Sequence, residues 1–368
     1  AWVRAMAKEV NNVETGDPDT RSTVFLQPVD SAKLPTEPSS PNTRLALVLG
    51  GLLGLAVAVA YALLRYTLDR RIRNAEGVER ETGVAVVGAV PDEKSFSAES
   101  RLIPFDGANS ANSKNAHLFA VAEAMRELRT NITFMDVDNP PRVIVVTSPL
   151  PGDGKSTTAS NLAIALAASG QHVVLIDGDL RRPMVANVFG LVEGAGLTDV
   201  LAGRAGIVDV AQRVGNGNLV IVPAGKVPPN PSEVLGSQRM KELLDAVSRE
   251  AFIIVDAPPL LPVTDAALLA HSADGAIVVS TVGRTTFEVL GKALANLDRA
   301  DARALGIVLN RVPRRGAGAA YYGYQYHGDY YRRDEEPVAT TSDAVSDEPI
   351  EGLLPDWPAP DEHLLGTA

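Results

Sequence analysis

The longest apolar run of the chain spans residues 45–64, and its 20 residues, LALVLGGLLGLAVAVAYALL, carry no charge. A helix of this length is roughly 30 Å long, which matches the hydrocarbon core of a bilayer. A buried helix of a soluble domain rarely continues so far without a polar face. The run therefore predicts one transmembrane helix over residues 44–66.

Basic residues follow the predicted span more densely than they precede it. Only Lys33 and Arg44 stand shortly before it, whereas five arginines follow: Arg65, Arg70, Arg71, Arg73 and Arg80. The positive-inside rule places the C-terminal side in the cytoplasm and residues 1–43 outside the cell. The arginine cluster after the span also favours contact with anionic membrane lipids.

The segment after the span is expected to be a cytoplasmic juxtamembrane segment and linker, residues 67–115. It contains a helix-like stretch at 69–82 and a strand-like run, VAVVGAV, at 84–90. Ser- and Asn-rich sequence follows, which is typical of a linker.

Apolar runs then alternate with helical stretches over residues 116–315. Six such runs occupy residues 142–148, 172–177, 218–224, 251–257, 275–281 and 305–312. Continuous apolar runs between helices indicate parallel strands that are covered on both faces. The pattern predicts an α/β domain with a doubly wound, mainly parallel sheet.

The first of these strands runs into the sequence SPLPGDGKST, residues 148–157. Glycine lets a loop turn its N–H groups toward phosphates, and the following helix points its positive end at them. Lys155 is expected to reach the β- and γ-phosphates, and the Ser156 hydroxyl to hold Mg²⁺. Pro149 stands where the generic pattern has glycine. The predicted nucleotide contacts are Pro151, Gly152, Asp153, Gly154, Lys155, Ser156 and Thr157.

Carboxylates end two further strands. Asp177 and Asp179 close VVLIDGD, and Asp256 closes FIIVD. Ligands bind at the carboxyl ends of the strands in such sheets, and Mg²⁺ would relieve the repulsion between the acids. For the pair, a solvated turn neutralised by Arg181 and Arg182 is the alternative. Together with the glycine loop, these positions predict ATP and Mg²⁺ binding, with Ser156, Asp177 and Asp256 as metal ligands and Lys155, Asp177, Asp179 and Asp256 as catalytic residues.

Composition changes this picture at the C-terminus. The formal net charge is −11, but residues 334–368 hold ten acidic residues and no Lys or Arg, so the remainder is close to neutral. A nucleic-acid-binding function gains no support from such a balance. The absence of cysteine excludes disulfides and thiolate metal sites. The acidic segment 334–368 is expected to be disordered, and the lack of an initial Met indicates a chain truncated at its N-terminus.

A tyrosine cluster precedes that acidic segment. The segment 316–333 contains YYGYQYHGDYY and holds six of the eight tyrosines. A tyrosine near an ATP site can accept a phosphoryl group if a nearby base, such as Asp177 or Asp179, takes its proton. The expected phosphoacceptors are Tyr321, Tyr322, Tyr324, Tyr326, Tyr330 and Tyr331.

The glycine loop, the carboxylate pair, the VDAPP strand and the tyrosine cluster together resemble the bacterial tyrosine kinases (BY-kinases) fused to chain-length-determinant polysaccharide co-polymerases. The resemblance implies a protein-tyrosine autokinase that phosphorylates its C-terminal tyrosines in trans within a ring-like homo-oligomer. It also implies control of the chain length or export of a capsular polysaccharide or exopolysaccharide, with the export machinery and a cognate tyrosine phosphatase as partners. Residues 1–43 would then end the extracellular chain-length-determinant domain.

The same resemblance assigns roles outside the nucleotide loop. It implies that Glu123, Arg126 and Arg129, spaced by three on one helix, form an oligomer contact. From the residues alone, a solvated helix face is the simpler interpretation. The resemblance to related ATPases implies that Asn310 contacts adenine, and a structural asparagine at a strand end is the alternative.

Two other functions remain open at the level of sequence. A membrane-associated ATPase switch of the partition or septum-positioning type shares this fold, but it carries a second lysine where this chain has Leu150. A non-catalytic chain-length regulator would bind ATP only to assemble, although the lysine and the three aspartates of the site are all present.

Overall fold

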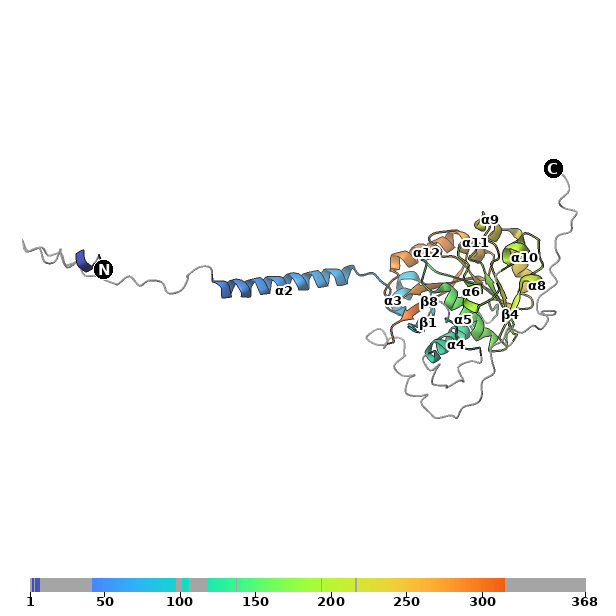
Figure 1. Ribbon diagram of the computed structural model, residues 1–368, viewed down its shortest axis with the longest axis horizontal. Coiled ribbons are helices and arrows are strands. Elements are labelled where there is room, and N and C mark those ends of the chain that lie inside the picture. The colour runs from blue at the N-terminus through green and yellow to red at the C-terminus, as the bar shows by residue number, and fades with distance from the viewer. Residues whose placement is uncertain are drawn as a thin grey trace, which may run out of the picture. The chain divides into compact units, whose positions relative to one another are not determined.

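The computed structural model describes residues 2, 4–6, 42–96, 101–105, 118–136, 138–192, 194–215 and 217–314 (Figure 1). The chain divides into two units, residues 1–69 and 70–368. The tyrosine cluster and the acidic segment lie outside the described residues, as does almost all of the stretch expected to be extracellular. The predictions made for them therefore remain predictions.

Helix α2, Thr43–Leu68, is the one helix of the described residues that is long and apolar enough to cross a membrane. Its most apolar window has a mean hydropathy of 2.4, and none of its side chains is buried. The Asn42 side chain caps its first turn by accepting from the Leu45 N–H at 3.3 Å. The helix coincides with the predicted span and extends it by a few residues.

The second unit is built on one eight-stranded sheet, with the order β1-β8-β7-β2-β6-β3-β5-β4. All neighbouring strands run parallel except β4, which pairs antiparallel with β5. The strands are β1 Val86–Pro91, β2 Val143–Thr147, β3 Val173–Asp177, β4 Gln212–Val214, β5 Leu219–Val222, β6 Phe252–Asp256, β7 Gly275–Thr281 and β8 Ala304–Val312.

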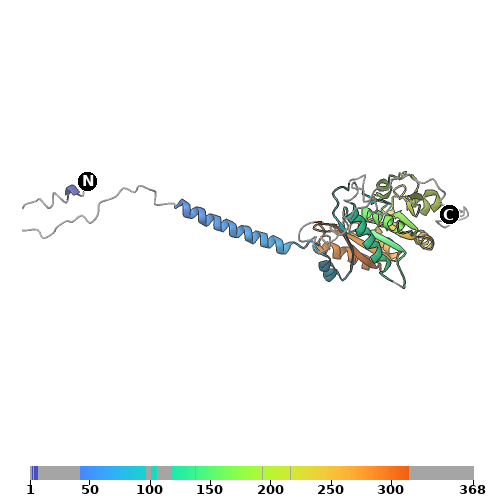
Figure 2. The ribbon, with the colours of Figure 1, turned by 90° about the horizontal axis from the view of Figure 1, so that it is seen from below.

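Helices cover both faces of this sheet, as the two ribbon views show (Figures 1 and 2). Helices α4 (Phe119–Thr133), α5 (Lys155–Ala167) and α6 (Val185–Phe189) pack on one face. The opposite face is covered by α3 Ala75–Thr82, α7 Leu197–Leu201, α8 Ile207–Val210, α9 Pro231–Leu235, α10 Gln238–Val247, α11 Asp265–His271 and α12 Phe287–Arg299. Central strands are buried on both faces, which explains their unbroken apolar runs.

Strand β1 belongs to the same sheet, although the sequence placed it in a linker. It pairs in parallel with β8, with Gly88 opposite Val308. The second unit begins at Arg70, so the expected domain boundary at residue 116 leaves out one strand and helix α3. The polar stretch between β1 and α4 suggested a domain boundary, but the elements before and after it belong to the same domain.

Candidate active site

The phosphate-binding loop connects β2 to α5 at the carboxyl edge of the sheet. Gly152 and Gly154 have φ of 84° and 93°, a left-handed conformation that favours glycine. A Cβ at Gly154 would lie 2.0 Å from the Asn310 amide nitrogen, so this position has no room for a side chain. Helix α5 begins at Lys155, so its amino end adjoins the loop.

Lys155 joins the three pieces of the site that the sequence predicted. Its ammonium lies 2.8 Å from a carboxylate oxygen of Asp179 and 3.3 Å from one of Asp256. It also contacts the Ser156 hydroxyl at 3.2 Å. Lys155, Asp179 and Asp256 are all buried, so the structure assembles a compact charged cluster from the start of α5 and the carboxyl ends of β3 and β6.

Asp177 lies opposite Asp256 in the sheet register, since β3 and β6 are adjacent. Its Oδ2 accepts the N–H groups of Met184 at 3.0 Å and Val185 at 2.9 Å, and its Oδ1 accepts that of Asp179 at 3.2 Å. These three bonds anchor the turn that follows β3. Asp177 thus stabilises the turn after β3, while the Asp179 carboxylate contacts Lys155.

Burial and neighbouring charges raise the pKa values of Asp177, Asp256 and Lys155. Burial, with the neighbouring Asp256 carboxylate, raises the pKa of Asp177 to about 7. Burial also raises the pKa of Asp256 above its usual range, although Lys155 opposes this. For Lys155, burial lowers the pKa, but the carboxylates of Asp256 and Asp179 outweigh it and the pKa is raised.

The donors present fit a Mg²⁺ ion carried by a nucleotide. Asp256 Oδ2 is buried without a hydrogen-bond partner, and the Ser156 hydroxyl lies beside the same lysine. Among the described residues, no three His, Cys, Asp or Glu side chains gather into a metal-binding group. Mg²⁺ usually takes one or two carboxylates and completes its shell with phosphates and water. The predicted ligands Ser156 and Asp256 suit this mode, whereas the oxygens of Asp177 already accept three N–H bonds.

Asp153 and Asn310 stabilise the phosphate-binding loop through hydrogen bonds. The Asp153 carboxylate is buried and accepts the Leu150 N–H at 3.2 Å. Asn310, at the end of β8, donates to the Asp153 carbonyl at 2.8 Å and accepts the Arg311 N–H at 2.8 Å. Both residues were predicted to bind the nucleotide, and that role stays a prediction. The structure shows them as supports of the phosphate loop.

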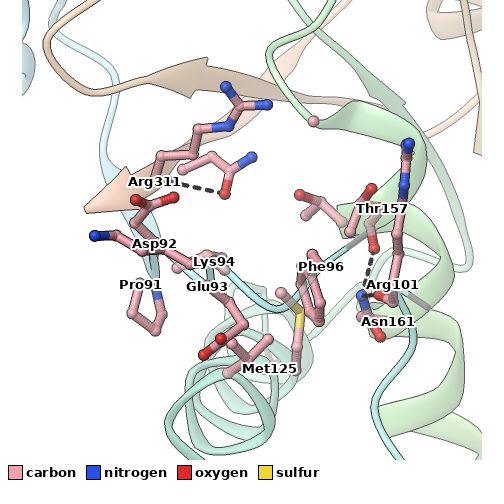
Figure 3. A pocket seen from close by; sticks show the side chains of 15 residues that line it. Pro91, Asp92, Glu93, Lys94, Phe96, Arg101, Met125, Thr157, Asn161 and Arg311 are labelled. Atoms are coloured by element: carbon pink, nitrogen blue, oxygen red, sulfur yellow. Dashed lines mark hydrogen bonds between the residues drawn. The ribbon is translucent and has the colours of Figure 1, made fainter. Parts of the chain in front are cut away.

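A cavity of about 340 Å³ opens beside the loop, between β1, α4, α5 and β8 (Figure 3). Phe96 and Met125 give it an apolar side, and Arg311 lies across the hollow from Thr157. Gly154 and Asn310 also line it, so the cavity adjoins the phosphate loop. Phe96 comes from the segment that the sequence assigned to the linker, and no sequence motif pointed to it.

A second hydrogen-bond network connects the turn after β3 to helices α9 and α11. Asp265, fully buried at the start of α11, accepts from Arg181 Nε at 2.7 Å and from the Ser232 hydroxyl at 2.6 Å. Arg181 thus pairs with Asp265, not with the Asp177–Asp179 pair as the solvated-turn alternative held. The three residues are far apart in the sequence, so no sequence motif pointed to this network.

The predicted oligomer residues lie on α4. Arg126 pairs with Glu123 within the chain. The Arg129 guanidinium donates to the Ala165 carbonyl at 3.3 Å, near the end of α5. This arrangement shows one intrachain ion pair and one helix contact, and the oligomer role stays a prediction.

Comparison with known proteins identifies the family of this site. The ParA family, described as NUBPL iron-transfer P-loop NTPase, matches residues 139–314. Tyrosine-protein kinase YwqD of Bacillus subtilis is 39% identical over 204 residues, which cover 55% of this chain and 86% of YwqD. The chain belongs to the bacterial tyrosine kinases.

Other bacterial tyrosine kinases agree with this assignment. Tyrosine-protein kinase etk of Escherichia coli K12 is 34% identical over 305 residues, or 80% of this chain and 42% of etk. The solved kinase domain of the E. coli tyrosine kinase ETK superposes with a TM-score of 0.58 at 31% identity, covering 65% of this chain and 95% of that domain. The chain therefore spans less than half the length of etk, and the resemblance inferred from the sequence is confirmed.

Proposed function

We propose that the protein is an ATP-dependent protein-tyrosine kinase whose acceptors are the tyrosines of its own C-terminal cluster. The observation that carries the proposal is the contact of the Lys155 ammonium with Asp179 and Asp256 beside the phosphate loop. Phosphoryl transfer needs positioned positive charge at the phosphates and carboxylates that hold a metal or accept a proton. The names of the relatives etk and YwqD as tyrosine-protein kinases support the same reaction.

The loop would bind the phosphates through its backbone N–H groups and through Lys155. The N–H groups at the start of α5 and the positive end of that helix favour phosphate oxygens. The Lys155 ammonium is held by two carboxylates in this structure. Its long, flexible side chain lets it turn from the carboxylates toward the phosphates when they enter.

Mg²⁺ would be held by Ser156 and Asp256, with Asp179 close by. When bound, the ion neutralises charge on the β- and γ-phosphates. The carboxylates of Asp179 and Asp256 would then keep a compensating positive charge beside them once Lys155 turns away. This assignment follows from the unpartnered Asp256 oxygen.

Transfer itself needs a proton acceptor for the phenol. The phenol oxygen forms a bond to the γ-phosphorus while the bond from that phosphorus to the β,γ-bridging oxygen breaks, and ADP leaves. The phenol proton passes to a carboxylate of the cluster. The candidates are Asp179, whose carboxylate contacts Lys155, and Asp177, whose raised pKa of about 7 suits a catalytic base.

The cavity beside the loop would hold the nucleoside. It adjoins Gly154 and Thr157, combines an apolar side at Phe96 and Met125 with polar groups, and encloses about 340 Å³. An apolar pocket with a few polar groups is the usual setting for a flat heterocycle. Its contact with Asn310 supports the adenine role inferred for that residue.

The wider role follows from the resemblance and from the membrane helix. Residues 321–331 would be phosphorylated in trans by a neighbouring copy in a ring, with α4 at the contact. Each phosphate adds about −1.5 to −2 charges, and repulsion would loosen the ring. The kinase domain would be cytoplasmic, residues 1–43 extracellular, and the process controlled would be polysaccharide chain length or export. The export machinery and a tyrosine phosphatase would be partners.

Phosphate mapping tests this proposal directly. The 368-residue chain, purified free of phosphate in detergent, is incubated with Mg-ATP, and its tyrosines are mapped by mass spectrometry. We expect phosphate on residues 321–331 in the wild type and none in Lys155→Met. ATP turnover with unmodified tyrosines would instead favour the ATPase switch, and nucleotide binding without either reaction would favour the non-catalytic regulator.

A further inference from the structure

The chain that follows the membrane helix is bound to the loop between β7 and α12. We call residues 70–72 the strap and residues 282–286 the bracket loop. Arg71 and Thr286 form an antiparallel β-bridge. The Ile72 N–H donates to the Thr285 carbonyl at 2.9 Å, and the Ile72 carbonyl accepts the Gly283 N–H at 2.8 Å. The strap is therefore attached through its backbone.

Side chains reinforce this attachment. Ile72 is fully buried in the hydrophobic core on the face of the sheet that α3 and α12 cover. The Arg71 guanidinium donates to the Gly283 carbonyl at 3.0 Å, and Arg70 pairs with Glu288 at 2.6 Å. The strap begins two residues after Leu68, the last residue of α2.

The bracket loop in turn holds the phosphate-binding loop. The Thr285 hydroxyl is buried and donates to Asp153 Oδ1 at 3.5 Å. The Arg284 guanidinium reaches the carbonyls of Gly152 and Pro151, each at 3.4 Å. At the end of β7, Thr281 donates to the Asp153 carbonyl at 3.4 Å.

These contacts are long, so each alone is weak. Together they hold the loop at three successive residues, 151–153. They use carbonyl oxygens and the Asp153 carboxylate, and none of them uses a backbone N–H group of the loop. A small shift of the bracket loop would displace those N–H groups, and electrostatic binding of phosphate depends on their placement.

We propose that Arg284 and Thr285 are positioning residues of the phosphate-binding loop, and that the strap holds them in place, so that nucleotide affinity depends on the docking of the strap. The inference rests on the proposed nucleotide site. Because binding linkage is reciprocal, bound nucleotide must also stabilise the strap. The connection from the strap to the phosphate-binding loop then consists of the two backbone hydrogen bonds of Ile72 and the buried Thr285 hydroxyl.

Paired substitutions at Thr285 test the first half. The full chain in detergent micelles is titrated with Mg-ADP by calorimetry, and its thermal unfolding is recorded without nucleotide. Thr285→Val removes the hydroxyl at nearly constant volume and should weaken affinity about fivefold, the effect of one ordinary hydrogen bond. Thr285→Ser keeps the hydroxyl and should bind nearly as the wild type does. Equal affinities in the Val and Ser variants would overturn the inference.

Hydrogen exchange tests the second half on the unmodified chain. Saturating Mg-ADP should slow exchange of the amides of Ile72 and Gly283, which bond the strap to the bracket loop, and of Phe287, which bonds the strap to the first residue of α12. Arg71→Ala should weaken Mg-ADP binding about threefold through loss of its bond to Gly283. Arg80→Ala, an exposed arginine of α3, controls for the lost charge and should bind as the wild type does.

The outcomes separate this inference from the proposed function. Unchanged exchange in the strap, or equal effects of Arg71→Ala and Arg80→Ala, would overturn the inference while leaving the nucleotide site intact. A wild-type chain that binds no Mg-ADP would overturn the proposed function, and the inference with it.

Discussion

One cation and three carboxylates share the centre of the site. Lys155 can balance only one of the charges of Asp177, Asp179 and Asp256, and all four groups are buried. Burying an uncompensated charge is costly, so such a cluster retains protons or binds a further cation. The raised pKa values of Asp177 and Asp256 are the first response, and Mg²⁺ would be the second.

This arrangement predicts an unusual pH dependence of stability in the absence of nucleotide. The pKa of Asp177 is raised to about 7 in the folded chain, against about 4 for an ordinary Asp. The folded state therefore binds more protons across this window, and stability is lost as pH rises from about 4 to about 7. We expect a shallower loss in Asp177→Asn, whose amide cannot ionise.

Thermal unfolding at several pH values between about 5 and 8 measures this slope. Asp256 titrates in the same direction, so the Asn variant keeps part of the dependence. Asp245→Asn, on the exposed face of α10, serves as the matched control and should keep the full slope. An unchanged slope in Asp177→Asn would assign the titration to another group.

The reactive residues were predictable because the aspartates follow apolar runs and Lys155 belongs to a glycine loop after such a run. Asp177, Asp179 and Asp256 were placed at strand ends from sequence and Lys155 at the start of the following helix, and the structure brings them together. Their supports were not predictable. Thr285 lies 132 positions from Asp153 along the chain, and a threonine in a loop carries no local sign of such a contact.

At the scale of elements, the edge strand β1 is the feature that the sequence misplaced. Its apolar run predicted a strand correctly, but its partner β8 lies more than 200 residues away in sequence. Strand β4 and the short helices α6 to α9 were also missed, since elements of three to five residues are too short to show a period. The long central strands were predicted nearly to the residue.

A close approach between β1 and β8 allows the placement of β1 to be tested. A Cβ at Gly306 of β8 would lie 2.4 Å from a methyl carbon of Val87. Gly306→Ala should therefore destabilise the protein by about 1–3 kcal/mol, the usual cost of overpacking. Val87→Ala removes the clash, so the double variant should lose less stability than the sum of the single variants.

Urea unfolding of the four proteins completes this double-mutant cycle. Gly291→Ala is the matched control, because an added Cβ on the exposed face of α12 meets no atom within 4 Å. It should stabilise the helix by roughly 0.5–1 kcal/mol. Simple additivity of the Val87 and Gly306 changes would show that β1 does not pack against β8 as described.

At the scale of the whole molecule, α2 makes this chain a membrane protein in our proposal. The helix is uncharged over its central residues, and its most apolar window has a mean hydropathy of 2.4. Each arginine at the centre of a membrane helix costs about 2.5–3.5 kcal/mol. Leu53→Arg combined with Val57→Arg should therefore move the chain out of the membrane fraction.

Extraction of membranes with alkaline carbonate measures this release. The control places two arginines at the ends of α2, Leu45→Arg with Leu68→Arg, where long basic side chains reach the headgroups. This control should stay in the membrane pellet. Retention of the central variant as well would mean that α2 does not span the bilayer.

Because Asp177 and Asp256 stand at strand ends, their position also determines where in the chain insertions and deletions are tolerated. Successive residues of a strand point to opposite faces of the sheet. One residue added within β3 or β6 would turn Asp177 or Asp256 away from its present neighbours and separate two residues that lie in register. The same insertion in the exposed connection at residues 226–230 would leave every strand in place. Insertions and deletions among descendants of this gene should therefore collect in surface connections and spare the two strands.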